Sequence, residues 1–317
     1  MDRAGMERLV SALEGRLMRA WVALIRRLRA QNPIAEIERR LHTDDPVAGI
    51  SDAAIAFASA RHEAYVAAGQ AAARALTAET DRLERVSKKL ITFDMLDPGV
   101  LSVAERSRLD LIREITTEQR ILIRAALIGG AESGANPREI AQEIRDEIGL
   151  TEYQERIVQN YRRELERGQY ADALARELSS GHSDRTIAAA VRNRTALSQA
   201  QIDAAVDRYR QNWIAFRAEN IARTESLRIA HQGTEELYRQ AIARGDVRTE
   251  QIERTWNTAH DPRVRSTHRS MDQQKRGFGE TFTTGAGVEL RFPADPAGPA
   301  KETIECRCVV STRLKAA

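Results

Sequence analysis

The sequence predicts an α+β protein: a long, mostly helical N-terminal two-thirds followed by a small α+β C-terminal module with a β-hairpin. Apolar residues recur at three- and four-residue steps through most of the chain before Gly245, which is the spacing of amphipathic helices. Aromatic residues make up only 5% of the 317 residues, whereas Ala, Arg, Glu and Leu are abundant. After Gly245 the helical periodicity ends, and Val, Thr, Phe, Gly and Pro become more frequent.

The first predicted helix covers residues 6–28 and ends before Asn32-Pro33, because the residue before a proline disfavours helical backbone. Arginines separate its apolar positions. We interpret it as a helix whose apolar stripe packs in a core; docking to an acidic partner or a membrane surface is the alternative. The stripe consists of Leu9, Leu13, Leu17, Trp21, Leu24 and Leu28.

More helices are expected along the rest of the N-terminal two-thirds. Asn136 is a candidate N-cap followed by a proline at the first helical position, and Thr151 is a second candidate N-cap. A long helix before Gly245 should join the helical part to the C-terminal module. The predicted ranges are 52–90, 102–128, 137–149, 152–178, 184–192 and 198–244.

Short strands are expected in the C-terminal module. Gly285-Ala286-Gly287 lies between two short segments rich in β-forming residues, which is typical of a hairpin. The predicted strands are 252–257, 280–284, 288–292 and 305–312. The resulting division is a helical N-terminal region over 1–135, a helical connecting region over 136–215 and an α+β module over 216–317.

Charge and composition exclude several classes of protein. The net charge of +3 is too balanced for a general nucleic-acid-binding surface. No apolar run approaches the roughly 20 residues of a membrane span, and the charged N-terminal stretch does not have the pattern of a signal peptide. We therefore expect a soluble intracellular chain. A glycine-rich phosphate loop is also missing, which argues against nucleotide hydrolysis.

Charged residues cluster late on the predicted helix 198–244. In an enzyme, Arg223 and Glu225 could act as an electrostatic clamp and as an acid/base group; alternatively, they belong to an ion-pair network that fixes this helix to the sheet. Helical spacing places Thr224, Arg228 and His231 on one face, and it brings Glu225 within reach of Arg228.

The segment after the first predicted strand carries two further candidates. Asp261 and His268 could form a general base and the residue that orients it. Five basic residues against two acidic ones over 261–276 form a local patch that could contact phosphate, although a solvated surface turn explains the same pattern. The basic residues are Arg263, Arg265, Arg269, Lys275 and Arg276.

Cys306-Arg307-Cys308 contains the only two cysteines of the chain. In a strand, residues two apart point to the same face. A disulfide between residues so close would be strained. Together with His268, the two thiols make three zinc ligands of the right type, with His260, Asp261 or water as the fourth. Two small buried cysteines packed under the hairpin are the alternative.

The order of these motifs resembles the C-terminal part of the Mu F-like phage head morphogenesis family, with a likeness that covers about residues 137–317. One departure stands out: Met271-Asp272-Gln273 replaces a frequent Leu-Asp-Gly. The missing glycine indicates a turn without positive φ, or the absence of a ligand at that loop. The resemblance rests on Arg223, Thr224, Glu225, Trp256, Asp261, Arg263, His268, Pro293, Asp295, Pro296, Cys306, Arg307 and Cys308.

This resemblance implies a non-enzymatic minor head protein of a phage or prophage. It would associate with the portal protein and other head proteins, aid procapsid assembly, DNA packaging or ejection, and contact DNA weakly. It would reside in the virion or procapsid, after assembly in the bacterial cytoplasm, and need no cofactor. The competing hypothesis is a zinc-dependent hydrolase or nuclease that uses His268, Cys306 and Cys308.

Overall fold

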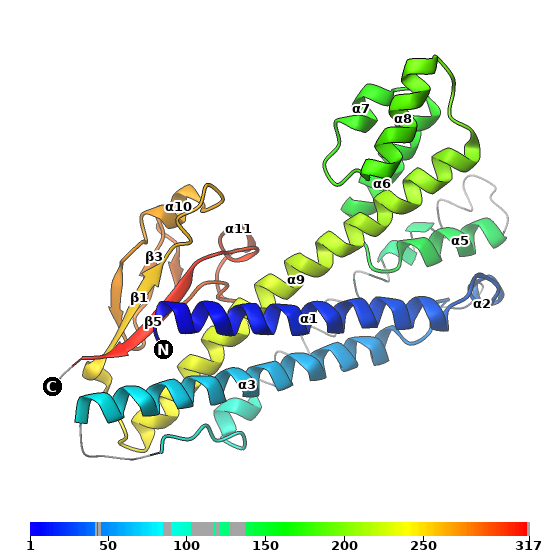
Figure 1. The fold of residues 1–317 in the computed structure, drawn as a ribbon. Helices are drawn as coiled ribbons and strands as arrows, with labels where there is room; N and C mark the ends of the chain where they lie inside the picture. Colours follow the sequence, from blue (N-terminus) through cyan, green and yellow to red (C-terminus); the bar gives the residue numbers. More distant parts are fainter. Residues whose placement is uncertain are drawn as a thin grey trace. The chain divides into compact units, whose positions relative to one another are not determined.

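The protein is mostly helical and ends in a small α+β module, as predicted (Figure 1). The computed structural model describes residues 1–315 except 42, 44–45, 85–89, 103–116, 118, 120, 124, 127 and 129–136. Its helices are α1 (Arg3–Gln31), α2 (Ile34–Arg40), α3 (Ile50–Glu84), α5 (Pro137–Glu147), α6 (Glu152–Glu166), α7 (Tyr170–Leu174), α8 (Gly181–Asn193), α9 (Gln199–Ala243), α10 (Ser266–Arg269) and α11 (Ala300–Thr303), with a 3-10 turn, η1 (Thr249–Gln251).

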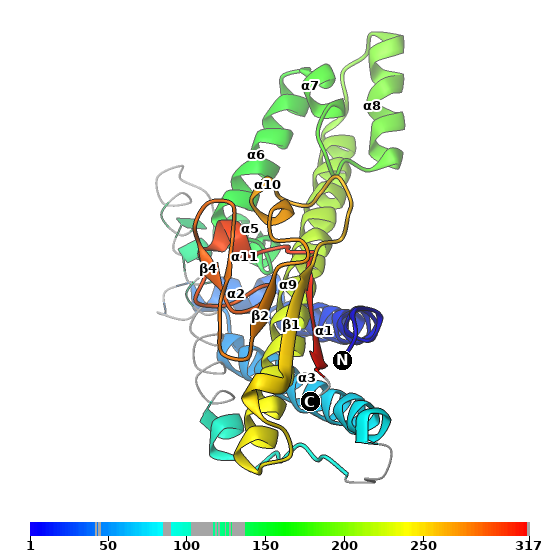
Figure 2. The ribbon, with the colours of Figure 1, turned by 90° about the vertical axis from the view of Figure 1, so that its left-hand side faces the viewer.

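The strands form two small antiparallel sheets. In the three-stranded sheet β1 is central, with β2 on one side and β5 on the other, as Figure 2 shows. The second sheet is the predicted hairpin, in which Phe282 pairs with Leu290. The strands are β1 (Ile252–Asn257), β2 (Lys275–Gly277), β3 (Phe282–Thr283), β4 (Glu289–Leu290) and β5 (Val309–Leu314).

Two compact units, each built from separated parts of the chain, make up the protein. Helices α1, α3 and α9 each contribute one stretch to unit 1 and another to unit 2. Because these units are made of separated segments, they do not test the predicted division into the continuous regions 1–135, 136–215 and 216–317, which stays a prediction. Unit 1 comprises Met1–Trp21, Ala56–Asp110 and Glu219–Ala317; unit 2 comprises Val22–Ile55 and Leu111–Ala218.

The apolar stripe of α1 packs in the interior, as interpreted from the sequence. Leu13, Leu17, Trp21, Leu24 and Leu28 are buried, and only Leu9 is half-buried. Within unit 1, the Trp21 ring meets Phe57 edge-on at 5.2 Å between centroids. Helix α1 thus contributes to the hydrophobic core, which is the main source of helix stability in a folded protein.

Local signals set the bounds of the helices in unit 2. Helix α5 begins at Pro137, and Thr151 caps α6 in a capping box with Gln154. The single predicted helix over 152–178 is wrong, because Gly168 adopts a left-handed φ of 71°. Gln169 N donates to Glu164 O at 2.8 Å, as in a Schellman C-cap, so α6 ends there and α7 follows separately.

Helix α9 agrees with its predicted range to within one residue at each end, and β1 agrees completely. Helix α8 is longer than predicted, and α3 ends before Leu90. The predicted helix over 102–128 falls largely outside the described residues, as does the N-cap candidate Asn136. In the part of the chain that is described, no helix combines the length and the apolar character needed to cross a membrane.

Two strand expectations need correction. Strand β2 was not predicted, because its three residues carry no alternating pattern of their own. The predicted closing strand over 305–312 is shifted: β5 begins at Val309, since Glu305 adopts a left-handed φ of 56° and interrupts extended backbone. The Cys-Arg-Cys segment therefore precedes the strand.

Candidate functional site

One face of α9 holds the C-terminal module through three side chains at helical spacing. Glu305 N donates to Thr224 Oγ1 at 3.1 Å, and Arg228 Nε donates to Ala294 O at 3.2 Å. Val310 N donates to Nε2 of His231 at 3.5 Å. The face that the sequence assigned to Thr224, Arg228 and His231 is thus where α9 contacts the module.

A buried ion-pair network surrounds Glu225. Its carboxylate accepts from Arg61 Nε of α3 at 2.5 Å and from Arg228 Nη1 at 2.6 Å. Burial opposes ionisation, but the charges of Arg61 and Arg228 outweigh it and hold the pKa of Glu225 below its usual value. Arg223 lies beside it and pairs with Glu14 at 3.4 Å. These residues form an ion-pair network, but it joins α9 to α3 and α1 and not, as the sequence had suggested, to the sheet.

The signature residues from Pro293 to Pro296 form a turn that faces α9. The Asp295 carboxylate is 2% exposed and accepts from Arg291 N at 2.9 Å and from Ala297 N at 3.1 Å. Ala294 has a left-handed φ of 63°. The capped turn presents the carbonyl group of Ala294 to Arg228, so this part of the signature serves packing.

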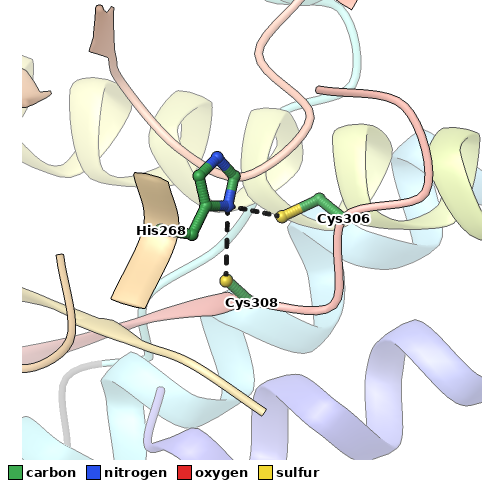
Figure 3. Close-up of side chains that lie close together, drawn as sticks. All are labelled: His268, Cys306 and Cys308. Atoms are coloured by element: carbon green, nitrogen blue, oxygen red, sulfur yellow. Dashed lines mark hydrogen bonds between the residues drawn. The ribbon is translucent and has the colours of Figure 1, made fainter. Parts of the chain in front are cut away.

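His268, Cys306 and Cys308 converge in the interior of the module. The Nδ1 atom of His268 lies 3.5 Å from Cys306 Sγ and 3.6 Å from Cys308 Sγ, as Figure 3 shows. All three residues are at most 2% exposed. In the described part of the chain they are the group whose side chains are close enough to hold a metal ion. The predicted ligand set is therefore assembled in space.

Contacts with the backbone just before Cys306 set the direction of the cysteines. Arg265 Nη2 donates to Ile304 O, and the amide of Glu305 is held by Thr224. The left-handed backbone of Glu305 then turns the chain toward His268. Thr224 of the helical signature thereby helps to position the Cys-Arg-Cys segment.

The two thiols differ in their protonation. A hydrogen bond from Cys308, aided by His268, lowers the pKa of Cys306 well below its usual value although burial opposes this. The same hydrogen bond raises the pKa of Cys308, and burial adds to the effect. Without a metal ion, negative charge on this pair of thiols is therefore favoured on Cys306 over Cys308.

Trp256 forms one wall of the cluster. It is fully buried, and its indole ring meets the imidazole of His268 edge-on at 5.5 Å and lies 5.3 Å from Phe282. A large aromatic side chain at this position excludes water and restricts the orientation of the His268 ring. The signature tryptophan thus supports the cluster from β1.

The proposed acid–base pair between Asp261 and His268 is wrong. The Asp261 carboxylate accepts from Arg263 N at 2.9 Å and lies 3.7 Å from Arg307 Nη1, so it closes a local turn. His260, the other fourth-ligand candidate, is half exposed and lies 3.7 Å from Asp272. Neither belongs to the metal-competent group.

Most members of the predicted basic patch have partners inside the module. Arg263 pairs with Asp261, and Lys275 lies 3.4 Å from Glu253. Arg276 Nε donates to Thr281 O at 2.8 Å, and Arg265 Nη2 donates to Ile304 O. The two ion pairs offset part of the positive charge of the patch, and the two carbonyl contacts hold the guanidinium groups of Arg265 and Arg276 against the module.

The turn around Gln273 corrects an expectation. Gln273 has a φ of 62°, so the turn does require left-handed backbone although glycine is missing. The backbone N–H group of Gln273 donates to Trp256 O at 2.8 Å, and this hydrogen bond connects the turn to β1. The turn therefore adopts a left-handed backbone at a residue other than glycine, which costs conformational free energy.

Sequence reasoning missed Glu302, which lies beside His268. Glu302 is 3% exposed, accepts from Thr267 Oγ1 at 2.8 Å and places Oε2 at 3.1 Å from His268 Nε2. Oε2 lies off the line of the Nε2–H bond, so this second contact is loosely aligned. The only local signal is a glutamate in the first turn after Pro299, which is typical of any short helix.

Comparison with known proteins identifies the family. The model of the family described as "Phage Mu protein F like protein" matches residues 122–311, which is more than half of the chain and includes every signature residue named above. No curated protein and no solved structure is similar enough to count as a match. The match and the order of the signature residues together show that the chain belongs to the Mu F-like phage head morphogenesis family.

Proposed function

We propose that this chain is a portal-associated minor head protein that aids procapsid assembly, DNA packaging or ejection. The family match over residues 122–311 carries the proposal. The site geometry supports it, because Thr224, Glu225 and Asp295 are engaged in contacts that hold the module together. Signature residues with such contacts favour a structural role over catalysis.

A hydrolase is less well supported by the same geometry. His268 and both cysteines are buried, and the nearest carboxylate, Glu302, contacts the far side of the imidazole ring from the sulfurs. A general base must reach the substrate or its water at hydrogen-bond distance. The described groups therefore favour a protein without turnover.

The segment 90–101 is the first surface to test for partner binding. It carries four exposed apolar side chains: Leu90 is 73% exposed, Leu96 is 77%, Leu101 is 49% and Met95 is 47%. Four exposed apolar side chains so close together in the chain favour a protein-binding role for this segment. We assign this segment to contact with another head protein.

Co-expression with the portal protein encoded in the same genome tests the proposal. The wild-type chain should co-elute with the portal at low and moderate salt. The double variant Leu90→Ser/Leu96→Ser should lose most of this co-elution, whereas Tyr153→Ser, which changes an apolar side chain of unit 2 that is 64% exposed, should keep it. A folded wild-type chain that ignores its portal at both salt concentrations would contradict portal association.

A weak, non-specific contact with packaged DNA is part of the proposal. Arg263 and Arg269 are exposed members of the basic patch, as is Lys275. Binding to phosphates releases counterions and therefore weakens steeply as salt rises. Fluorescence anisotropy with random-sequence duplex DNA should show weak binding that is further reduced in Arg263→Ala/Arg269→Ala. Binding that is unchanged in this variant would exclude the patch as the DNA contact.

A further inference from the structure

The Nδ1 atom of His268 faces two sulfurs at nearly equal distances, 3.5 Å and 3.6 Å. An imidazole nitrogen has either one proton or one lone pair, so it makes one well-directed hydrogen bond. A hydrogen-bonded cluster would therefore favour one sulfur over the other. The near symmetry indicates that all three atoms point toward a common centre (Figure 3).

The distances correspond to the edges of a zinc tetrahedron. Bond lengths of about 2.0 Å for Zn–N and about 2.3 Å for Zn–S place N and S about 3.5 Å apart at a tetrahedral angle. The two N–S separations of the cluster agree with this value. The three ligand atoms all lie within 4.8 Å of one another, which sets the upper limit of the S–S separation; two zinc-bound thiolates lie about 3.8 Å apart.

Glu302 supplies the carboxylate that usually accompanies a zinc-bound histidine. Its Oε2 atom lies 3.1 Å from Nε2, on the side of the ring opposite the sulfurs. A carboxylate there favours the tautomer that has its proton on Nε2, which leaves the lone pair on Nδ1 free for a metal. Thr267 holds the same carboxylate oxygen at 2.8 Å.

We propose that His268 Nδ1, Cys306 Sγ and Cys308 Sγ supply three of the ligands of one buried Zn²⁺ ion, with Glu302 orienting the imidazole. The ion would join α10 to the segment that leads into β5, which are 38 residues apart along the chain. Thiolate and imidazole ligands suit zinc, and their burial suits a structural site. This assignment is independent of portal binding.

Zinc analysis of the full-length protein tests the proposal. Wild-type protein purified without chelators should contain about one zinc per chain by elemental mass spectrometry. Cys306→Ser, Cys308→Ser and His268→Asn should each lose most of it. His260→Gln is the matched control and should keep the metal, because this histidine lies eight residues away and outside the cluster. Zinc that is retained in all three cluster variants would overturn the site.

Cobalt substitution keeps the test decisive if those variants fail to fold. Wild-type protein loaded with Co²⁺ should show a thiolate-to-cobalt charge-transfer band in the near ultraviolet and the visible bands of tetrahedral cobalt. Folded wild-type protein that shows no such band, and that binds no zinc after dialysis against buffered zinc, would overturn the proposal.

The positioning role of Glu302 has a separate readout. Glu302→Gln should keep one zinc per chain but bind it about 10- to 100-fold more weakly in competition with a chromogenic chelator, as expected when a carboxylate that orients a ligand is lost. Glu302→Asp should recover part of the affinity. An unchanged zinc affinity in Glu302→Gln would remove Glu302 from the assignment.

Discussion

Helix α6 of unit 2 and the Cys-Arg-Cys segment of unit 1 are fixed in opposite ways. The ends of α6 are set by residues within five positions, namely the capping box of Thr151 with Gln154 and the turn at Gly168. The Cys-Arg-Cys segment is held by Thr224, Arg265 and His268, which lie far away in the chain. Local signals therefore define the helices, whereas non-local contacts define the candidate site.

The largest effect expected from breaking a non-local contact is at Glu225. Glu225→Ala leaves the guanidinium group of buried Arg61 without its partner. Breaking a buried ion pair in this way costs about 3–5 kcal/mol, so the free energy of unfolding in urea should fall by that amount. The exposed pair Arg162–Asp203 is the control, and Arg162→Ala should cost less than about 1 kcal/mol. Equal losses in the two variants would contradict the comparison.

Acid should weaken unit 1 through His231, whose pKa is lowered to about 3, chiefly by burial and further by the charge of Arg254. The folded state excludes a proton that the unfolded state takes up below its pKa of about 6.5, so this stability is present above that pH and is lost as the pH falls toward 3. The loss between pH 7 and pH 5 should be about 2 kcal/mol.

Urea unfolding at the two pH values measures this dependence. His231→Gln keeps an oxygen acceptor for Val310 N but removes the titrating ring, so stability should vary less with pH. His182→Gln changes an exposed histidine of unit 2 and should leave the dependence as it is in the wild type. A wild-type stability that stays constant from pH 7 to pH 5 would contradict the assignment.

A smaller effect is expected for the local contact at Thr151. Thr151→Ala removes the side-chain acceptor for Gln154 N and should lower the free energy of unfolding by about 1 kcal/mol. Thr186→Ala makes the same substitution inside α8, where alanine is the better helix former, so it should be neutral or slightly stabilising. Circular dichroism in urea measures both. Similar losses in the two variants would show that the cap does not determine the stability of α6.

The same contrast explains what the sequence could predict. The ranges of α9 and β1 and the cap of α6 follow from periodicity and capping residues, which act within a few positions. Strand β2 exists only through pairing with β1, so its three residues carry no signal of their own. Candidate ligands were found because Cys and His are chemically distinctive.

Other parts of the site lay beyond sequence reasoning for physical reasons. Glu302 is an ordinary surface-type residue until the fold buries it beside His268. The sequence suggests Asp261 as a catalytic partner of His268, but in the structure its carboxylate accepts a hydrogen bond from Arg263 N. The side chain that a carboxylate meets depends on tertiary packing, which periodicity does not encode.

The smallest expected effect is a gain in stability at Gln273, where local backbone preference and non-local pairing disagree. The φ of 62° at Gln273 is unfavourable for a residue other than glycine, but the backbone N–H group of Gln273 donates a hydrogen bond to Trp256 O of β1. Gln273→Gly should relieve the backbone and raise the free energy of unfolding by up to about 1 kcal/mol. Arg269→Gly places the same residue at the last position of the short helix α10, where the backbone is right-handed, so no gain in stability is expected there. Thermal unfolding of both variants distinguishes the two cases.

Destabilisation by Gln273→Gly would mean that contacts of the Gln273 side chain, and not the pairing with β1, hold this turn in the left-handed region.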